Sequence, residues 1–191
     1  METRRDLTKE LLANCFKELL KTRAFEKITI KNITDKAGLI RPTYYKHFQD
    51  KYELLEWIFL REIGDETTPL VENDRFFDAL KVLCEGLERD KAYYRKAFRI
   101  TGANSFRDVL TAYIYDIFLM IARKYHPKLD NGSSYLTPEL AARFYMNGLV
   151  SLIEDWIFDD KACGAEEFCR TYQYLLMNSV PDLFSLFDLA T

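Results

Sequence analysis

Residues 39–51, LIRPTYYKHFQDK, concentrate basic and hydrogen-bonding side chains in one short stretch. Arg41 can place two guanidinium N–H groups on the O6 and N7 acceptors of guanine, while Pro42 and the Thr43 methyl group can touch a thymine methyl group. Two side chains further along can reach phosphate oxygens: Tyr45 and His47. These residue types in this order predict a surface that binds double-stranded DNA.

Three short helices are expected to position these side chains. A first amphipathic helix covers about residues 5–21, and Thr29 is a suitable N-cap for a second helix that ends before Gly38. Gly38 suits the left-handed residue that closes this helix and begins a tight turn. The third helix then projects outward from the other two, as in a helix-turn-helix.

Two positions that flank this third helix are also expected to meet phosphate. Thr29 and Lys51 lie at predicted helix N-termini, where free backbone N–H groups attract anions. Asp50 is the expected N-cap of the helix that begins at Lys51 and continues to about Gly64. A three-helix head whose aromatic residues only fill its own core is the competing interpretation.

Charge is distributed unevenly along the chain. Residues 1–51 contain twelve Lys and Arg against seven Asp and Glu, whereas residues 52–191 contain fifteen against twenty-three. A basic head on an acidic body indicates that only the head meets a polyanion. Chance scatter of surface charge is nearly as good an explanation, so the prediction of DNA binding depends on the motif.

Composition places the chain among ordinary globular proteins. It has 191 residues, of which 48% are hydrophobic and 30% charged, and only seven Gly and five Pro interrupt it, so long helices are expected. No stretch approaches about 18 uncharged apolar residues, and the first residues do not resemble a signal peptide, which predicts a cytoplasmic protein without a membrane partner. Cys163 and Cys169 lack metal-ligand spacing, and no metal or cofactor is predicted.

The rest of the chain predicts an all-α body. A polar stretch over residues 66–73 contains Pro69 and marks the expected joint, which divides the chain into a head (1–50), a connecting helix (51–64) and a body (65–191). Capping residues and apolar periodicity predict five body helices. These cover about residues 73–89, 90–100, 105–125, 137–158 and 164–179.

The body has features of a ligand pocket and of a dimer interface. Twenty-three of the 28 aromatic residues follow residue 51, and such residues line pockets for small organic molecules, although at helical spacing they more often form core. Five residues are the candidates for lining a pocket: Tyr113, Ile117, Met120, Phe144 and Gly148. The helices over 137–158 and 165–179 are apolar on a wide arc, which predicts burial against a second copy in a homodimer.

The head resembles the TetR family of transcriptional regulators over about the first 63 residues. The matching pattern runs from Ile28-Thr29 through Ala37-Gly38-Leu39 and Thr43-x-Tyr45-x-His47-Phe48 to Asp50-Lys51 and Leu54-Leu55. This resemblance implies an all-helical homodimer that reads a palindromic operator, with an effector pocket and a four-helix dimer interface in the body. It further implies phosphate contacts from Thr29, Tyr45, His47 and Lys51. Base contacts are implied for Lys31, Arg41, Pro42, Thr43 and Lys46.

Two details refine this resemblance. Ile40 stands where members of the family commonly have a polar cap such as Ser, so a head that binds a partner transcription factor remains an alternative to one that binds an operator. The segment 144–157, FYMNGLVSLIEDWI, resembles a subgroup that includes activators of dihydroxyacetone kinase operons, with Asn147-Gly148 in place of the usual double Gly. The sequence does not distinguish activation from repression.

An enzyme is the remaining class of protein to consider. His47 and His126 are the two imidazoles, and neither lies near a Cys or Ser in a nucleophile arrangement. The chain contains no glycine-rich loop that would cradle a phosphate. No catalytic residue is therefore predicted.

Overall fold

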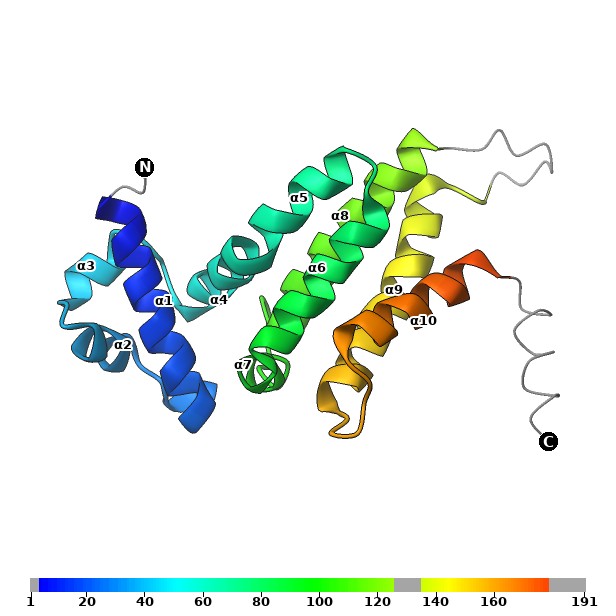
Figure 1. Ribbon diagram of the computed structural model, residues 1–191. Helices are drawn as coiled ribbons and strands as arrows, with labels where there is room; N and C mark the ends of the chain where they lie inside the picture. Colours follow the sequence, from blue (N-terminus) through cyan, green and yellow to red (C-terminus); the bar gives the residue numbers. More distant parts are fainter. Residues whose placement is uncertain (1–3, 126–134, 179–191) are drawn as a thin grey trace.

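The computed structural model describes residues 4–125 and 135–178, and these two ranges contain helices and turns without a β-strand. The predicted all-α class is confirmed. A head of three helices lies at one end of the molecule, and the last two helices lie at the other (Figure 1). The α-helices are α1 (Arg4–Thr22), α2 (Ile30–Ala37), α3 (Arg41–Tyr45), α4 (Lys51–Phe59), α5 (Asp65–Glu72), α6 (Phe76–Arg89), α7 (Lys91–Ala97), α8 (Phe106–Lys124), α9 (Pro138–Phe158) and α10 (Ala165–Met177).

Two shorter elements complete the described ranges: the 3-10 helix η1 (Phe25–Lys27) and the π-helix η2 (Leu60–Gly64). Within residues 4–125 and 135–178, no helix has the length and hydrophobicity that a membrane crossing requires. Residues 126–134 of the expected loop, and Ser179 at the expected end of the last helix, lie outside the described residues.

The head folds around side chains from all of its helices. Phe16 on α1, Ile33 on α2 and Tyr44 on α3 are fully buried together. Phe25 fills the same core from η1 and meets the Phe16 ring edge to face, with ring centroids 6.2 Å apart. This small core holds α3 at the edge of the head.

The sequence predicts that the connecting helix ends at about Gly64, and this prediction was wrong. Helical structure continues from α4 through the π-turn of η2 into α5, where the Asp65 N–H donates to the Leu60 carbonyl five residues earlier. The polar residues of this stretch lie on its exposed side, whereas Thr67 and Val71 are buried against α6. Thr67 and Val71 are four residues apart and form a narrow buried stripe on one side of the helix. Polar residues surround them in the sequence, so apolar periodicity did not indicate a helix here.

The body is a set of packed helices in which α8 runs along α9 and α6 lies between α5 and α10. Ser105 and Asp108 form the expected capping box at the start of α8, and the Thr137 hydroxyl caps α9 as predicted. Asn73 does not begin α6 but ends α5, because its side-chain amide donates to the Pro69 carbonyl at 2.7 Å. The following helix starts three residues later, at Phe76.

Candidate DNA-binding surface and ligand cavity

The N-terminus of α2 is built by Thr29 and Asn32. The Asn32 N–H donates to the Thr29 hydroxyl at 3.1 Å, and the Thr29 N–H donates to the Asn32 side-chain oxygen at 3.0 Å. This reciprocal capping box fixes the direction of the helix while Thr29 stays exposed. The Asn32 N–H is occupied by this cap, and the other N–H groups at the start of α2 lie at a helix N-terminus where a phosphate can bind.

The turn between α2 and α3 depends on Gly38. This residue adopts φ 65° and ψ 28°, the left-handed conformation expected from the sequence, and its N–H donates to carbonyls in the last turn of α2. Ile40 then takes the extended conformation of an N-cap without a side chain that can accept a hydrogen bond. Its side chain is 68% exposed. The start of α3 therefore carries an exposed apolar group in place of a polar cap.

Helix α3 separates a buried face from an exposed one. Tyr44 and Phe48 are buried, and the Tyr44 hydroxyl donates to the Asp50 carbonyl at 2.8 Å, which ties α3 to the start of α4. The Arg41 guanidinium approaches the Tyr45 hydroxyl at 3.4 Å on the outer side. Thr43 is half-buried. Four of the predicted DNA contacts are exposed here: Arg41, Pro42, Tyr45 and Lys46.

Lys31 extends this exposed surface from α2. Its ammonium is exposed and lies 2.9 Å from the Asp35 carboxylate one turn later. A surface ion pair of this kind contributes less than about 1 kcal/mol. A DNA phosphate or base edge can therefore compete for the same ammonium group at little cost.

His47 is half-buried at the end of the recognition segment. Its Nδ1 atom is buried and has no hydrogen-bond partner among the described residues. Burial lowers the pKa of the imidazole below its ordinary value of 6.5, and the cationic groups of Arg5, Lys9 and Lys46 lower it further. The ring is therefore neutral near pH 7 and keeps one N–H that can donate to a phosphate oxygen.

We expect His47 to make the head less stable in acid. Because its folded-state pKa lies below the unfolded value of 6.5, the unfolded chain binds a proton more tightly. This contribution to stability is complete above pH 6.5 and is lost as the pH falls through the folded pKa. The Tm of the parent should fall more steeply between pH 7.5 and 5 than that of His47→Gln, as measured by circular dichroism. Parallel curves would contradict this assignment.

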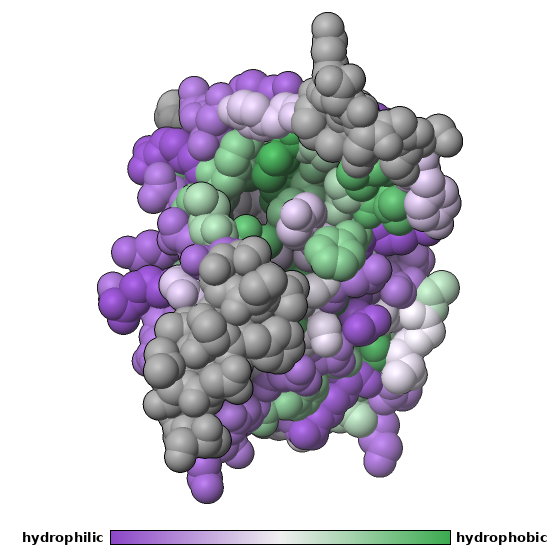
Figure 2. Space-filling model, turned by 90° about the vertical axis from the view of Figure 1, so that its right-hand side faces the viewer, coloured by the Kyte–Doolittle hydropathy of each residue, from purple (hydrophilic) through white to green (hydrophobic). Residues whose placement is uncertain are grey.

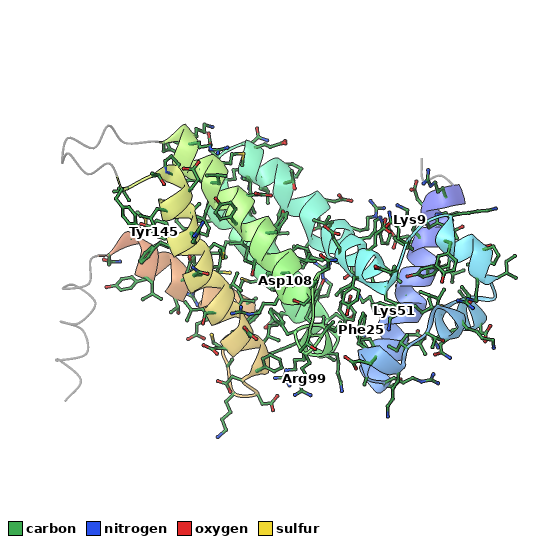
Figure 3. The ribbon with its side chains drawn as sticks, turned by 180° about the vertical axis from the view of Figure 1, so that it is seen from behind. Lys9, Phe25, Lys51, Arg99, Asp108 and Tyr145 are labelled. Carbon is green, nitrogen blue, oxygen red and sulfur yellow. The ribbon has the colours of Figure 1, made fainter. Side chains whose placement is uncertain are left out.

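Lys51 is directed into the head and away from the exposed side of α3. Its ammonium donates to the Phe25 carbonyl at 2.7 Å and lies 4.0 Å from the centre of the Phe25 ring (Figure 3). Burial lowers the pKa of this ammonium group. The side-chain carboxylate of Asp50 already accepts from two N–H groups at the start of α4. The structure thus separates Lys51 from the other predicted contacts and gives it a role in fixing η1.

A charged cluster that sequence reasoning did not anticipate joins the head to the body. The Lys17 ammonium on α1 lies 2.5 Å from the Glu62 carboxylate on η2 and 3.0 Å from the Asp90 carboxylate before α7. Lys21 also reaches Asp90, at 2.8 Å, and the Tyr94 hydroxyl donates to Glu62. Burial raises the pKa of the Asp90 carboxyl, but hydrogen bonds from Lys21 and Lys17 outweigh it and keep that pKa below its ordinary value.

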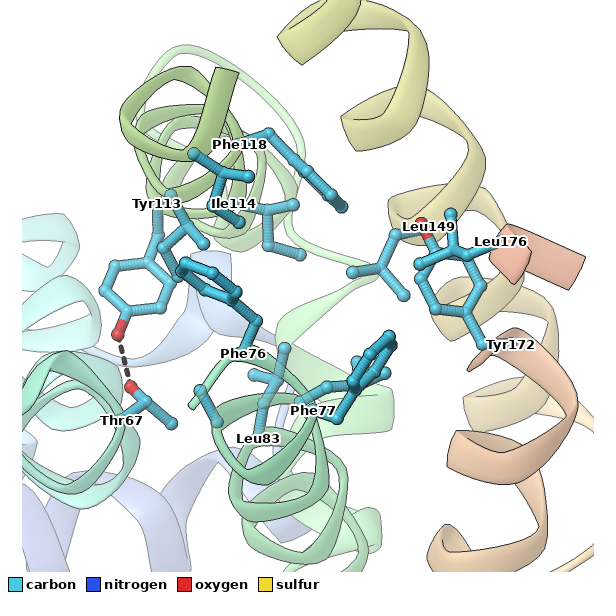
Figure 4. Close-up of a pocket in the computed structure, with 14 residues that line it drawn as sticks. Thr67, Phe76, Phe77, Leu83, Tyr113, Ile114, Phe118, Leu149, Tyr172 and Leu176 are labelled. Carbon is cyan, nitrogen blue, oxygen red and sulfur yellow. Dashed lines mark hydrogen bonds between the residues drawn. The ribbon is translucent and has the colours of Figure 1, made fainter. Parts of the chain in front are cut away.

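The body contains a narrow cavity of about 70 Å³ between α5, α6, α8, α9 and α10 (Figure 4). Its lining is almost entirely apolar and aromatic, which suits an organic molecule. The predicted residues Tyr113 and Ile117 both line it. The other lining residues are Thr67, Phe76, Phe77, Ala79, Leu80, Leu83, Ile114, Phe118, Ile121, Leu149, Tyr172 and Leu176.

A wider groove of about 640 Å³ adjoins this cavity. It lies between the end of α8 and the first turns of α9, and hydrophobic residues surround a hollow on this face (Figure 2). The cavity and the groove share four lining residues and are therefore adjacent: Phe77, Phe118, Ile121 and Leu176. Phe144 lines the groove, whereas Met120 and Gly148 line neither space.

Helices α9 and α10 leave large apolar side chains uncovered in the single chain. Phe144 is 72% exposed, and Gly148, one turn later, has open space above its Cα, since a Cβ there would meet no atom within 4 Å. The other exposed apolar residues of these two helices are Tyr145, Leu152, Tyr174, Leu175 and Met177. A patch of this kind is typical of a surface that a partner covers.

Comparison with known proteins agrees with both parts of this structure. Residues 17–58 match the model described as "Bacterial regulatory proteins, tetR family", and residues 74–178 match one described as "Transcriptional regulator C-terminal region". The dhaKLM operon transcriptional activator DhaS of Lactococcus lactis subsp. lactis (strain IL1403) is 29% identical over 94 residues. That match covers 49% of this chain, and the chain spans about half the length of this curated relative.

Solved structures share the fold over nearly the whole chain. The dihydroxyacetone kinase operon activator DhaS superposes with a TM-score of 0.63 at 22% identity, covering 90% of this chain and 94% of its own. NalD, the secondary repressor of a multidrug efflux pump in Pseudomonas aeruginosa, has a TM-score of 0.61 at 16% identity, covering 88% and 96%. Thermus thermophilus FadR, a repressor in complex with lauroyl-CoA, has a TM-score of 0.62 at 17% identity, covering 90% and 94%. The head, the body and these matches together establish that the chain belongs to the TetR family of bacterial transcriptional regulators.

Proposed function

We propose that this regulator acts as a homodimer that binds a palindromic operator through α3 and responds to a small molecule held in the body. The observation that carries the proposal is the exposed side of α3, where Arg41, Tyr45 and Lys46 stand outward from a helix whose opposite face is fully buried. A helix presented in this way fits the major groove of B-DNA.

The contacts divide by chemistry. Five residues of α3, its C-cap and the adjacent α2 are proposed to meet base edges, because α2 and α3 are in contact and none of these side chains is buried: Lys31, Arg41, Pro42, Thr43 and Lys46. Tyr45, His47 and the capped N-terminus at Thr29 are proposed to meet phosphates. The ammonium of Lys51 donates to the Phe25 carbonyl inside the head, so the phosphate contact of this residue is proposed through its backbone N–H at the start of α4.

Small-molecule response is proposed for the cavity and its groove. The cavity touches Thr67 on α5, which is continuous through η2 and α4 with the head. A ligand that binds one separation of two heads more tightly than another will shift the population toward it, by no more than its differential affinity. The structurally similar repressor FadR was solved in complex with lauroyl-CoA, and this supports an apolar effector for the proposed function.

Gel-shift titration of the purified protein against its own upstream region tests the DNA-binding proposal. Direct operator binding predicts a retarded band that survives competitor DNA and weakens steeply with salt, because counterions are released when phosphates are contacted. Retardation only in the presence of a second transcription factor would support the alternative that the head binds a partner protein. The relative named as a dhaKLM operon activator does not favour that alternative.

Replacing Arg41 with Ala should weaken operator binding by about 1–3 kcal/mol and relax the preference at one base pair, because a bidentate contact with guanine is lost. Selection of bound sequences from random duplexes, followed by titration, measures both effects. Arg123→Ala removes an exposed arginine from α8 in the body and serves as the control. An Arg41→Ala protein that selects the same sequences as the parent would show that this side chain does not read a base.

A further inference from the structure

Polar groups in the narrow cavity are few and are placed at opposite sides. Among its described lining residues, three carry hydroxyl groups: Thr67, Tyr113 and Tyr172. The Tyr172 hydroxyl donates to the Tyr145 carbonyl at 3.4 Å on the α10 side. Thr67 and Tyr113 are hydrogen-bonded to one another on the side of α5 (Figure 4).

The direction of the Thr67–Tyr113 hydrogen bond follows from the other contact of Thr67. The Thr67 hydroxyl has a single proton and lies 2.8 Å from the Ile63 carbonyl, which can only accept. When that proton is donated to Ile63, the Thr67 oxygen accepts the proton of Tyr113. The Tyr113 oxygen is left with acceptor capacity and without a proton for a further partner.

This arrangement selects the kind of polar group that a ligand can bring. An ether or carbonyl oxygen placed beside Tyr113 would find no proton and would remain unsatisfied in an apolar surrounding. A ligand hydroxyl can donate to the Tyr113 oxygen and extend the existing chain of hydrogen bonds. No charged side chain lines either the cavity or the adjoining groove among the described residues, so an ionised group has no counter-charge there.

We propose that this cavity binds a neutral, elongated apolar molecule whose terminal hydroxyl donates to Tyr113, with its chain directed toward the groove. This inference rests on the proposed ligand-responsive function of the body and names the class of ligand. The narrow cavity, about 70 Å³, suits a chain end, and the shared lining residues open into the groove of about 640 Å³.

The same contact places the ligand beside the connecting helix. The hydrogen-bond chain from Tyr113 through Thr67 ends on the carbonyl of Ile63, inside the π-turn of η2. The Tyr113 ring also packs edge to face on Phe59, with centroids 5.2 Å apart, and a Cβ on Gly64 would lie 3.8 Å from it. Tyr113 is thus the residue through which the ligand hydroxyl contacts the helix that leads to the head.

Calorimetric titration with two probes of equal size tests the proposal. 1-Octanol carries a hydroxyl, whereas 1-methoxyheptane has the same number of heavy atoms but no donor. The parent should bind 1-octanol at least about fivefold more tightly, as expected for one neutral hydrogen bond. Tyr113→Phe should bind both probes with similar affinity, and Tyr172→Phe should keep the preference of the parent.

Thr67→Val provides a second variant that leaves Tyr113 in place. It frees the Tyr113 proton for a ligand acceptor, so the preference for 1-octanol should shrink because 1-methoxyheptane gains a hydrogen bond. Equal binding of the probes by the parent, a preference retained in Tyr113→Phe, or no binding of 1-octanol would each overturn the proposal. Operator retardation by the same preparations reports separately on DNA binding, so a failure here does not depend on the head.

Discussion

Phe144→Glu should convert the proposed homodimer to a monomer and weaken operator binding by at least about 100-fold. Phe144 is the most exposed large apolar residue of α9 and lies one turn before Gly148, whose missing side chain permits close approach of a second helix. A carboxylate buried in such an interface would be desolvated without a partner, which costs several kcal/mol. Each head alone would then hold only half of the phosphate contacts.

Sedimentation velocity and gel-shift titration measure the two parts of this prediction. Met120→Glu is the matched control, because Met120 is also an exposed apolar residue but lies on α8, outside α9 and α10. The control should remain a dimer and bind the operator as the parent does. A dimeric Phe144→Glu protein would place the interface elsewhere and would require another explanation for the exposed residues of α9 and α10.

Local signals explain why the head could be predicted from its sequence. Thr29, Gly38 and Asp50 each act through backbone groups within a few residues, so their roles as N-cap, left-handed C-cap and N-cap follow from residue type and spacing. The buried pair Tyr44 and Phe48 also follows from its four-residue spacing. These features place α3 and its exposed side with little help from distant parts of the chain.

Features that depend on contacts between distant segments could not be predicted in the same way. Lys51 has the residue type and position of a phosphate contact, but its ammonium is engaged by Phe25, 26 residues earlier. Pro69 and its polar neighbours predict a break, whereas packing of Thr67 and Val71 against α6 sustains a helix. Helical periodicity similarly grouped Met120 with Tyr113, although the direction in which α6 and α10 approach decides which residues line the cavity.

Lys17→Met should lower the free energy of unfolding by roughly 2–4 kcal/mol, because it leaves the carboxylates of Glu62 and Asp90 close together without their shared cation. The Lys17 side chain is only 14% exposed, and the Asp90 side chain is 18% exposed. Water therefore screens the carboxylates that remain after the substitution poorly. Glu62 is 34% exposed, which keeps the expected loss below that of a fully buried pair. Urea denaturation followed by circular dichroism measures the change.

Two further variants show whether the loss arises from this cluster. Lys81→Met removes a lysine from an exposed pair with Glu85, 3.8 Å away, and should change stability by less than about 1 kcal/mol. Adding Glu62→Gln to Lys17→Met removes one of the stranded charges and should recover part of the loss, whereas additive effects would mean that the two side chains do not interact. Because Lys17 belongs to the head while Glu62 and Asp90 belong to the connecting helix and the body, recovery in the double variant would identify this cluster as an electrostatic contact that holds the head against the body.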